Sequence, residues 1–103
     1  MEVKNAIFTG IMSIVGMVYY SGEANFDDLV NFIQEPQNQY DKYAVRVENI
    51  DGKTVGYVKK ADAEKLTELM TNKKVQKTQG RILSERNRLC LSMRIEQIFI
   101  ETS

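Results

Sequence analysis

The stretch AVRVENIDGKTVGYV, residues 44–58, alternates apolar and polar side chains before an Asp-Gly pair and returns to apolar residues after it. A period of two places alternate side chains on opposite faces of a strand. The Asp51-Gly52 pair is typical of a tight hairpin turn, because glycine tolerates the positive φ that such a turn requires. We therefore predict an antiparallel hairpin with strands over residues 44–49 and 53–58.

The spacing of apolar residues changes directly after this hairpin. Ala63, Leu66, Leu69 and Met70 recur at helical spacing, which indicates one buried helix face. Acidic residues stand at the start of this segment and two lysines follow its end, an arrangement that the helix dipole favours. We predict one helix over residues 61–72.

Further strands flank these two elements. The apolar run from Ala6 to Tyr20 is rich in β-branched residues and predicts a buried strand, or two short ones divided near Gly10. The best-defined strand in that run covers residues 11–20. Further strands are expected over residues 28–35, 75–83 and 89–100, with a polar turn at 84–88 between the last two. The alternation in the last strand slips near Gln97, as a bulge would produce. Five to six strands and one main α-helix predict a mainly β domain over residues 1–103, a small antiparallel barrel of the OB-like or SH3-like type.

The composition excludes several classes of protein. A chain of 103 residues is long enough for one modest core and short for two domains. It contains no histidine and a single cysteine, Cys90. An intramolecular disulfide, a structural zinc site and every histidine-based catalytic triad are therefore excluded. We expect a protein that is not an enzyme and that needs no cofactor and no metal.

Charge is distributed unevenly, although the formal net charge is zero. Residues 1–51 hold three Lys/Arg against eight Asp/Glu, whereas residues 52–103 hold eleven against six. One interpretation is that the second half binds an anionic partner. The other is that two oppositely charged halves pack together.

The apolar run near the N-terminus also needs testing as a membrane or export segment. It is interrupted by Thr9, Gly10, Ser13 and Gly16 and is too short to span a bilayer. It also lacks a positively charged start and a small-residue cleavage site. We therefore expect no membrane contact and a cytoplasmic location, which suits one unpaired cysteine.

The densest group of polar and aromatic residues is EPQNQYDKYA, residues 35–44. From the residues alone this segment has two interpretations. In the first, it is an Asx-type turn in which Asn38 or Asp41 bonds to nearby backbone and a tyrosine caps the barrel. In the second, it is a binding loop in which an exposed tyrosine stands beside a hydrogen-bonding carboxylate.

Three sequence blocks, in order and in register, resemble the HIRAN domain. The first is VGMVYYSG at residues 15–22, and the second is the Glu-Pro-x-Asn-x-Tyr-Asp-x-x-Ala-Val-x-Val pattern from Glu35 to Val47. The third is VGYVKK at residues 55–60, directly before the predicted helix. The resemblance covers residues 11–75.

The resemblance implies a modified OB-like barrel that binds DNA. In eukaryotic members the domain is attached to SWI/SNF-type helicase-like remodellers and captures the 3′-hydroxyl end of single-stranded DNA at stalled forks. Carried over by motif, the implied DNA-binding residues are Tyr19, Tyr20, Asn38, Tyr40, Asp41, Tyr57 and Lys60. The implied partners are single-stranded DNA and a helicase or repair protein, in DNA repair or replication.

The chemistry of these residue types agrees with the implied role. A tyrosine ring can stack on the π-face of any base. The Asp41 carboxylate is a poor neighbour for phosphate and a good acceptor for a terminal hydroxyl, which favours a strand end. Lys60, near the predicted helix start, can contact phosphate. On a strand, however, the adjacent Tyr19 and Tyr20 would point to opposite faces, so only one could face the ligand.

The chain departs from the family pattern at three places. Val18 precedes the tyrosine pair where a basic residue is common, and Gln39 stands where proline is common before the loop tyrosine. Tyr57 occupies a position where some relatives have histidine. No helicase or nuclease segment accompanies the matching blocks, so we expect a stand-alone module.

Two alternative functions are considered beside DNA binding. One is a protein–protein interaction adaptor that uses the same barrel. The other is a nuclease, which would need clustered carboxylates around Mg²⁺. Asp27, Asp28 and Asp41 are the plausible ligands, and nothing in the sequence places them together. The sequence therefore favours the nuclease least.

Overall fold

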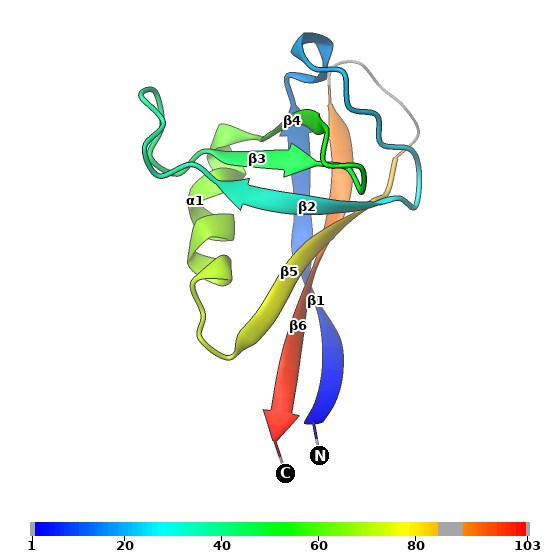
Figure 1. The fold of residues 1–103 in the computed structure, drawn as a ribbon, viewed down its shortest axis with the longest axis vertical. Helices are drawn as coiled ribbons and strands as arrows, with labels where there is room; N and C mark the ends of the chain where they lie inside the picture. Colours follow the sequence, from blue (N-terminus) through cyan, green and yellow to red (C-terminus); the bar gives the residue numbers. More distant parts are fainter. Residues whose placement is uncertain (1, 85–89, 103) are drawn as a thin grey trace.

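The computed structural model describes the backbone of residues 2–84 and 90–102 and the side chains of residues 8–84 and 90–98. Within these ranges the chain forms a closed antiparallel barrel and one α-helix (Figure 1). In their order around the barrel, the strands are β1 (Glu2–Val15), β4 (Thr54–Val58), β3 (Val45–Glu48), β2 (Leu29–Gln34), β5 (Val75–Ile82) and β6 (Leu91–Thr102). The helix α1 (Lys60–Met70) and a short 3₁₀ turn, η1 (Met17–Tyr19), complete these elements. The predicted mainly β barrel is confirmed.

The hairpin and the helix form as the sequence predicts. Strands β3 and β4 pair antiparallel across a turn in which Gly52 has a φ of 78°. Helix α1 begins one residue before and ends two residues before the predicted bounds. Its residues Ala63 and Leu66 are buried against the barrel, and Leu69 and Met70 pack beside them. Burial of the Leu66 side chain contributes about 1.5–3 kcal/mol.

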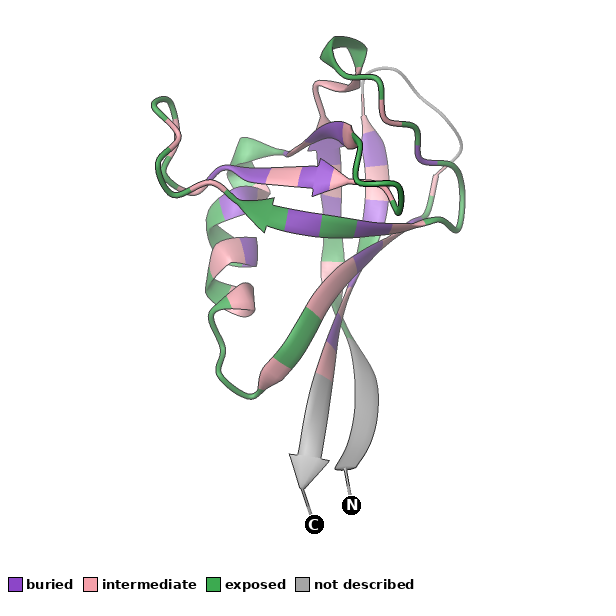
Figure 2. Cartoon of the chain, viewed as in Figure 1, coloured by how far each residue is buried: buried purple, intermediate pink, exposed green. Residues whose placement is uncertain are grey.

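Buried residues alternate with more exposed ones along several strands (Figure 2), and the buried ones form one core. The largest fully buried side chains are those of Ile14, Val30, Val45, Val47, Val55, Leu66, Ile82, Met93 and Ile95. Leu66 comes from α1, so the helix closes one side of the same core. These side chains occupy the interior of the barrel, so we expect a ligand to bind at its rim or outer surface.

The two ends of the molecule differ in shape. Strands β1 and β6 pair from Ile14 and Leu91 down to Glu2 and Thr102, and they leave the barrel as a two-stranded ribbon that carries both termini (Figure 1). The loop between β2 and β3 and the turn η1 lie toward the opposite end (Figure 1). That end, away from the termini, holds most of the candidate residues.

The predicted strand over residues 11–20 is wrong in its second half. Strand β1 ends at Val15 because Gly16 adopts a left-handed conformation with a φ of 80°, which turns the chain out of the sheet. The N–H groups of Tyr19 and Tyr20 then donate to the carbonyls of Gly16 and Met17, at 3.1 and 3.2 Å. The two tyrosines therefore do not alternate across a strand, and both are exposed.

The irregularity predicted near Gln97 is present in the pairing, but it lies on the strands beside β6 and not on β6 itself. The face of β6 that is buried at Leu91 stays buried at every second residue through to Gln97. The buried amide is tolerated because it donates to the Leu69 carbonyl at 2.7 Å. The pairing irregularities lie on the neighbouring strands, between Phe8 and Gly10 of β1 and within β5. Most of the predicted turn at 84–88, and the strand start at residue 89, lie outside the described residues.

Candidate functional site

The loop between β2 and β3 is held in shape by its own side chains. The amide oxygen of Asn38 accepts hydrogen bonds from the backbone N–H groups of Tyr40 and Asp41, at 2.9 and 3.1 Å. The Oδ1 atom of Asp41 accepts one from the N–H of Tyr43 at 2.8 Å. These are Asx-type turns. Both side chains therefore have the turn role that was one of the two interpretations of this segment.

The turn role leaves part of Asp41 available. Within the described residues, no hydrogen bond reaches its second carboxylate oxygen, Oδ2. Tyr40, next to it at the tip of the loop, is 91% exposed. Tyr43 instead packs against the core, with the Lys42 Nζ atom 5.0 Å from its ring centroid. The loop thus presents one exposed ring beside one open acceptor.

Two tyrosines from distant parts of the chain contact each other near this loop. Tyr20, directly after η1, and Tyr57 of β4 have ring centroids 5.8 Å apart and planes tilted by 47°. Such a tilted arrangement is a favourable geometry for aromatic pairs. Tyr19 projects from η1 and is 81% exposed, without a contact to another aromatic ring in the described part of the chain. The Tyr20 and Tyr57 rings therefore pack against each other and form one aromatic surface. The Tyr19 ring projects separately.

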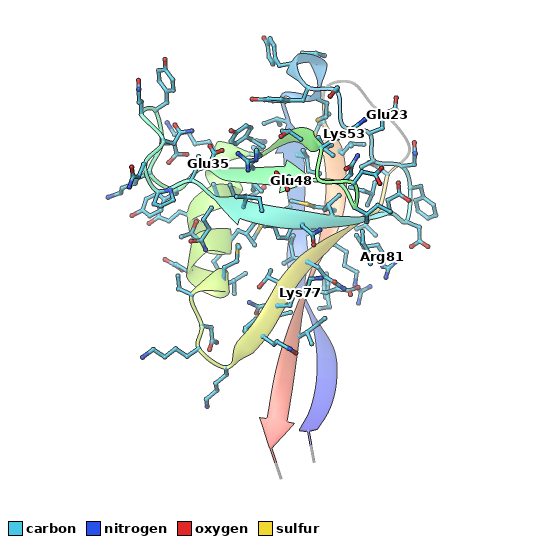
Figure 3. The ribbon with its side chains drawn as sticks, viewed as in Figure 1. Glu23, Glu35, Glu48, Lys53, Lys77 and Arg81 are labelled. Carbon is cyan, nitrogen blue, oxygen red and sulfur yellow. The ribbon has the colours of Figure 1, made fainter. Side chains whose placement is uncertain are left out.

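Glu35 directly follows β2, where the loop to β3 begins (Figure 3). The Tyr57 hydroxyl donates to it and lies 2.9 Å from each carboxylate oxygen. The side-chain Nδ2 of Asn38 donates to the same carboxylate at 3.1 Å, and Nη1 of Arg46 donates at 2.9 Å. Arg46 also pairs with Glu48 at 3.1 Å. One carboxylate therefore contacts β3, β4 and the loop.

The acidity of Tyr57 reflects this contact. Burial, followed by the hydrogen bond to Glu35 and the negative charge of Glu35, raises the pKa of Tyr57 from 10.0 to about 12. The phenol is therefore protonated at neutral pH, and its proton is directed at Glu35. Tyr57 can offer its ring to a ligand, whereas its O–H donor is already used.

Glu35 and Arg46 are absent from the DNA-binding residues that the family resemblance implies, although Glu35 begins the second sequence block. Arg46 faces Tyr57 directly across β3 and β4, and directly opposite residues share a face of the sheet. The strand pairing of the predicted hairpin would therefore have been enough to place Arg46 opposite Tyr57. Glu35 lies two residues beyond Ile33, the partner of Arg46 on β2, and its N–H donates to the Ala44 carbonyl, so its contacts depend on how β2, β3 and β4 pair.

Lys60 follows the strand that carries Tyr57. It is the first residue of α1 and is exposed. Within the described residues, no hydrogen bond or ion pair links its side chain to the tyrosines or to Glu35. The helix start itself is fixed, because the N–H of Lys59 donates to the Ser13 carbonyl at 2.8 Å and Asp62 accepts from the Ser13 N–H at 3.2 Å. Lys60 therefore extends from a fixed backbone position into solvent.

The described residues contain no group of three or more Asp, Glu or Cys side chains arranged to hold a metal ion. The carboxylates that a nuclease would need are thus not gathered in this part of the chain. Nor does the helix that the structure describes have the length and apolar character needed to cross a membrane.

Comparison with known proteins identifies the family. The sequence matches the HIRAN domain over residues 7–100. Because the match covers most of the chain, the chain belongs to the HIRAN family. It is also 44% identical over 63 residues to the helicase-like transcription factor of Oryctolagus cuniculus, which is 61% of this chain and 6% of that protein. The chain therefore spans a small fraction of the length of this relative.

Solved HIRAN structures share the fold. The crystal structure of the HIRAN domain of human HLTF aligns with a TM-score of 0.79 and 29% identity, over 95% of this chain and 79% of that one. An NMR structure of the HLTF HIRAN domain in its DNA-bound conformation aligns with a TM-score of 0.66 and 30% identity, over 90% of this chain and 78% of that one. The family and the barrel predicted from the three sequence blocks are confirmed, and the match extends into β6.

Proposed function

We propose that this chain is a non-catalytic module that binds single-stranded DNA and prefers a strand that ends in a 3′-hydroxyl. One observation carries the proposal: the exposed ring of Tyr40 stands on a fixed loop beside Asp41, whose Oδ2 has no hydrogen bond within the described residues. The DNA-bound HIRAN domain of HLTF supports DNA as the class of ligand. In repair or replication, such a module would bring a helicase or repair protein to a DNA end.

Each part of the site has a role in this proposal. Tyr40 stacks on a base, and the Tyr20 ring, supported by Tyr57, offers a second aromatic surface. Asp41 Oδ2 accepts a hydrogen bond from the terminal hydroxyl and would repel a terminal phosphate. Lys60 contacts a phosphate of the incoming strand.

Asn38 has an indirect role in this scheme. Its Oδ1 already accepts two backbone hydrogen bonds and its Nδ2 already donates to Glu35. An amide that is bonded at both ends contributes by shaping the loop. Tyr19, which is exposed and close in sequence to Tyr20, is available for an additional stacking contact.

Fluorescence anisotropy tests the proposal directly. The probe is a 5′-labelled oligonucleotide of about ten nucleotides, within the span that one small barrel covers. It is used as a 3′-hydroxyl strand, a 3′-phosphate strand and a blunt duplex. We expect the tightest binding for the 3′-hydroxyl strand. Equal affinity for all three would contradict end recognition, and no binding to any of them would contradict DNA binding.

A protein-interaction adaptor is the second candidate, and exposed apolar side chains outside the site favour it. Ile50, at the tip of the turn between β3 and β4, is 78% exposed, and Phe26 before β2 is also exposed. Exposed apolar groups of this size occur at protein interfaces. Salt dependence separates the two functions, because DNA affinity falls steeply as counterions compete. Binding through Ile50 and Phe26 would change little with salt and would be lost in Ile50→Asp.

A further inference from the structure

The Glu35 carboxylate accepts hydrogen bonds from three parts of the fold. Tyr57 on β4, Arg46 on β3 and Asn38 in the loop all donate to it, at distances between 2.9 and 3.1 Å. Its side chain is 21% exposed. A carboxylate that already accepts these hydrogen bonds has little capacity left for a ligand. Glu35 is therefore suited to act on other residues of the site.

Two of these partners each control a different part of the candidate site. The Tyr57 ring supports Tyr20, and its hydroxyl is held by Glu35. The Asn38 amide can orient its oxygen toward the loop backbone only if its Nδ2 points the other way, and that nitrogen donates to Glu35. The aromatic surface and the loop tip are thus fixed by one group.

We propose that Glu35 is the positioning residue of this site: its carboxylate holds the Tyr57 phenol and the Asn38 amide together, so that the aromatic pair and the Tyr40–Asp41 tip are presented in one arrangement. The inference rests on the proposed function, because it concerns the geometry that a strand end meets. Hydrogen bonds to an ionised carboxylate are stronger than neutral ones. The charge as well as the shape of Glu35 is therefore required.

The substitution Glu35→Gln tests this requirement. A glutamine has one acceptor oxygen and one NH₂ donor group, so it cannot accept from Tyr57, Asn38 and Arg46 at once. The matched control is Glu48→Gln, which removes the other carboxylate on Arg46 and leaves the bonds to Tyr57 and Asn38 in place. Thermal unfolding followed by circular dichroism identifies a temperature at which all the variants are fully folded, and binding is measured at that temperature.

Binding to a 5′-labelled 3′-hydroxyl oligonucleotide is the first measurement. We expect Glu35→Gln to weaken binding about tenfold, the loss that one charge-assisted hydrogen bond produces. We expect Glu48→Gln to bind as the wild type does. Wild-type affinity in folded Glu35→Gln, or an equal loss in both variants, would overturn the positioning role. Failure of the wild type to bind any oligonucleotide would overturn the proposed function, and the inference with it.

Two readouts without DNA distinguish these failures. Ultraviolet titration should show the pKa of Tyr57 falling in Glu35→Gln and staying raised in Glu48→Gln. The amide NMR signals of Tyr40 and Asp41 should shift or broaden in Glu35→Gln alone. Unchanged loop signals would contradict the link between Glu35 and the loop even if DNA binding were established.

Tyr57→Phe provides a second variant if Glu35→Gln does not fold. It removes only the phenol oxygen and keeps the ring against Tyr20. We expect a loss of about threefold on its own. Where Glu35→Gln does fold, the double variant should bind no more weakly than Glu35→Gln alone. Strictly additive losses, or no loss in Tyr57→Phe, would show that the contact is structural only.

Discussion

The rings of Tyr20 and Tyr57 lie 5.8 Å apart because β1 ends at Val15 and the chain turns before it reaches Tyr20. Strand β1 pairs with β4 only at Ile14 and Val15, and Val15 stands opposite Tyr57 itself. Gly16 then turns the chain, and η1 leads it to Tyr20 beside Tyr57. The aromatic surface of the site is therefore produced by a break in a strand.

Gly16→Ala should damage this surface. The φ of 80° at Gly16 is costly for any residue with a Cβ, and we expect a loss of roughly 1–2 kcal/mol in the free energy of unfolding. DNA affinity should fall as well, because Tyr20 would move. Gly52→Ala is the matched control, since Gly52 has a φ of 78° in a turn away from the site. It should cost similar stability in urea unfolding and leave affinity unchanged; equal affinity losses would argue against a local effect of Gly16.

Tyr40→Ala should weaken binding to any single strand by roughly 1–3 kcal/mol, the value of one base–aromatic stack. At 91% exposure the ring stabilises little of the fold, so the melting temperature should not change. Ile50→Ala serves as the control, because it removes another highly exposed apolar side chain outside the site. A drop in melting temperature for Tyr40→Ala, without a loss of affinity, would show that this ring stabilises the fold and does not contact DNA.

The barrel and the helix could be predicted because the signals that define them are local. Alternation around Val45 and Val47, and helical spacing at Ala63 and Leu66, report directly which side of each element is buried. The predictions failed where one residue overrides a continuous pattern. Gly16 ends the strand within an otherwise apolar run. Gln97 interrupts the apolar alternation of β6 although it is buried, because its amide donates to the carbonyl of Leu69, which is distant in the sequence.

The candidate site was predictable only in part. The motif directed attention to Asn38 and Asp41, and the structure places both in turns that fix the loop. Glu35 belongs to the motif without an implied role, because its contacts with Arg46 and Tyr57 depend on the pairing of three strands. Long-range polar contacts leave no periodic trace in a sequence.

Lys60→Ala tests the electrostatic part of the site. A lysine that contacts one phosphate should change the log–log salt slope of single-strand binding by about 0.7. The affinity loss should be similar for all sequences, since phosphate contacts do not distinguish bases. Lys73 and Lys74, exposed beyond the end of α1, provide controls whose replacement by alanine should leave the slope unchanged. An unchanged slope in Lys60→Ala would remove it from the site.

Tyr57 should make stability depend on alkaline pH. Its pKa is about 12 in the folded protein and 10.0 in the absence of the fold, so the folded state binds the phenolic proton more tightly. The stabilising contribution is therefore complete below pH 10 and is lost as the pH rises toward 12. Urea unfolding across this interval should show a steeper loss for the wild type than for Tyr57→Phe. Parallel curves would contradict the raised pKa.

Asp41 separates end recognition from turn formation, and two substitutions are needed to test it. Asp41→Ala removes the Oδ1 acceptor of the Tyr43 N–H as well as Oδ2. It should cost roughly 1.5–3 kcal/mol on a 3′-hydroxyl strand and nothing on a 3′-phosphate strand. Asp41→Asn keeps an oxygen for the turn and removes the charge, so the fold should be unaffected.

On the 3′-hydroxyl strand, Asp41→Asn should lose about 1.5 kcal/mol, because its one oxygen serves the turn and the NH₂ group that replaces Oδ2 accepts no hydrogen bond. On the 3′-phosphate strand it should bind equally or more tightly, because the repulsion between the carboxylate and the terminal phosphate is gone. The ratio of the affinity for the 3′-hydroxyl strand to that for the 3′-phosphate strand, measured by anisotropy, should therefore fall toward one. The circular dichroism spectrum should stay unchanged. If both strands lose affinity equally in Asp41→Asn, the carboxylate serves the turn alone.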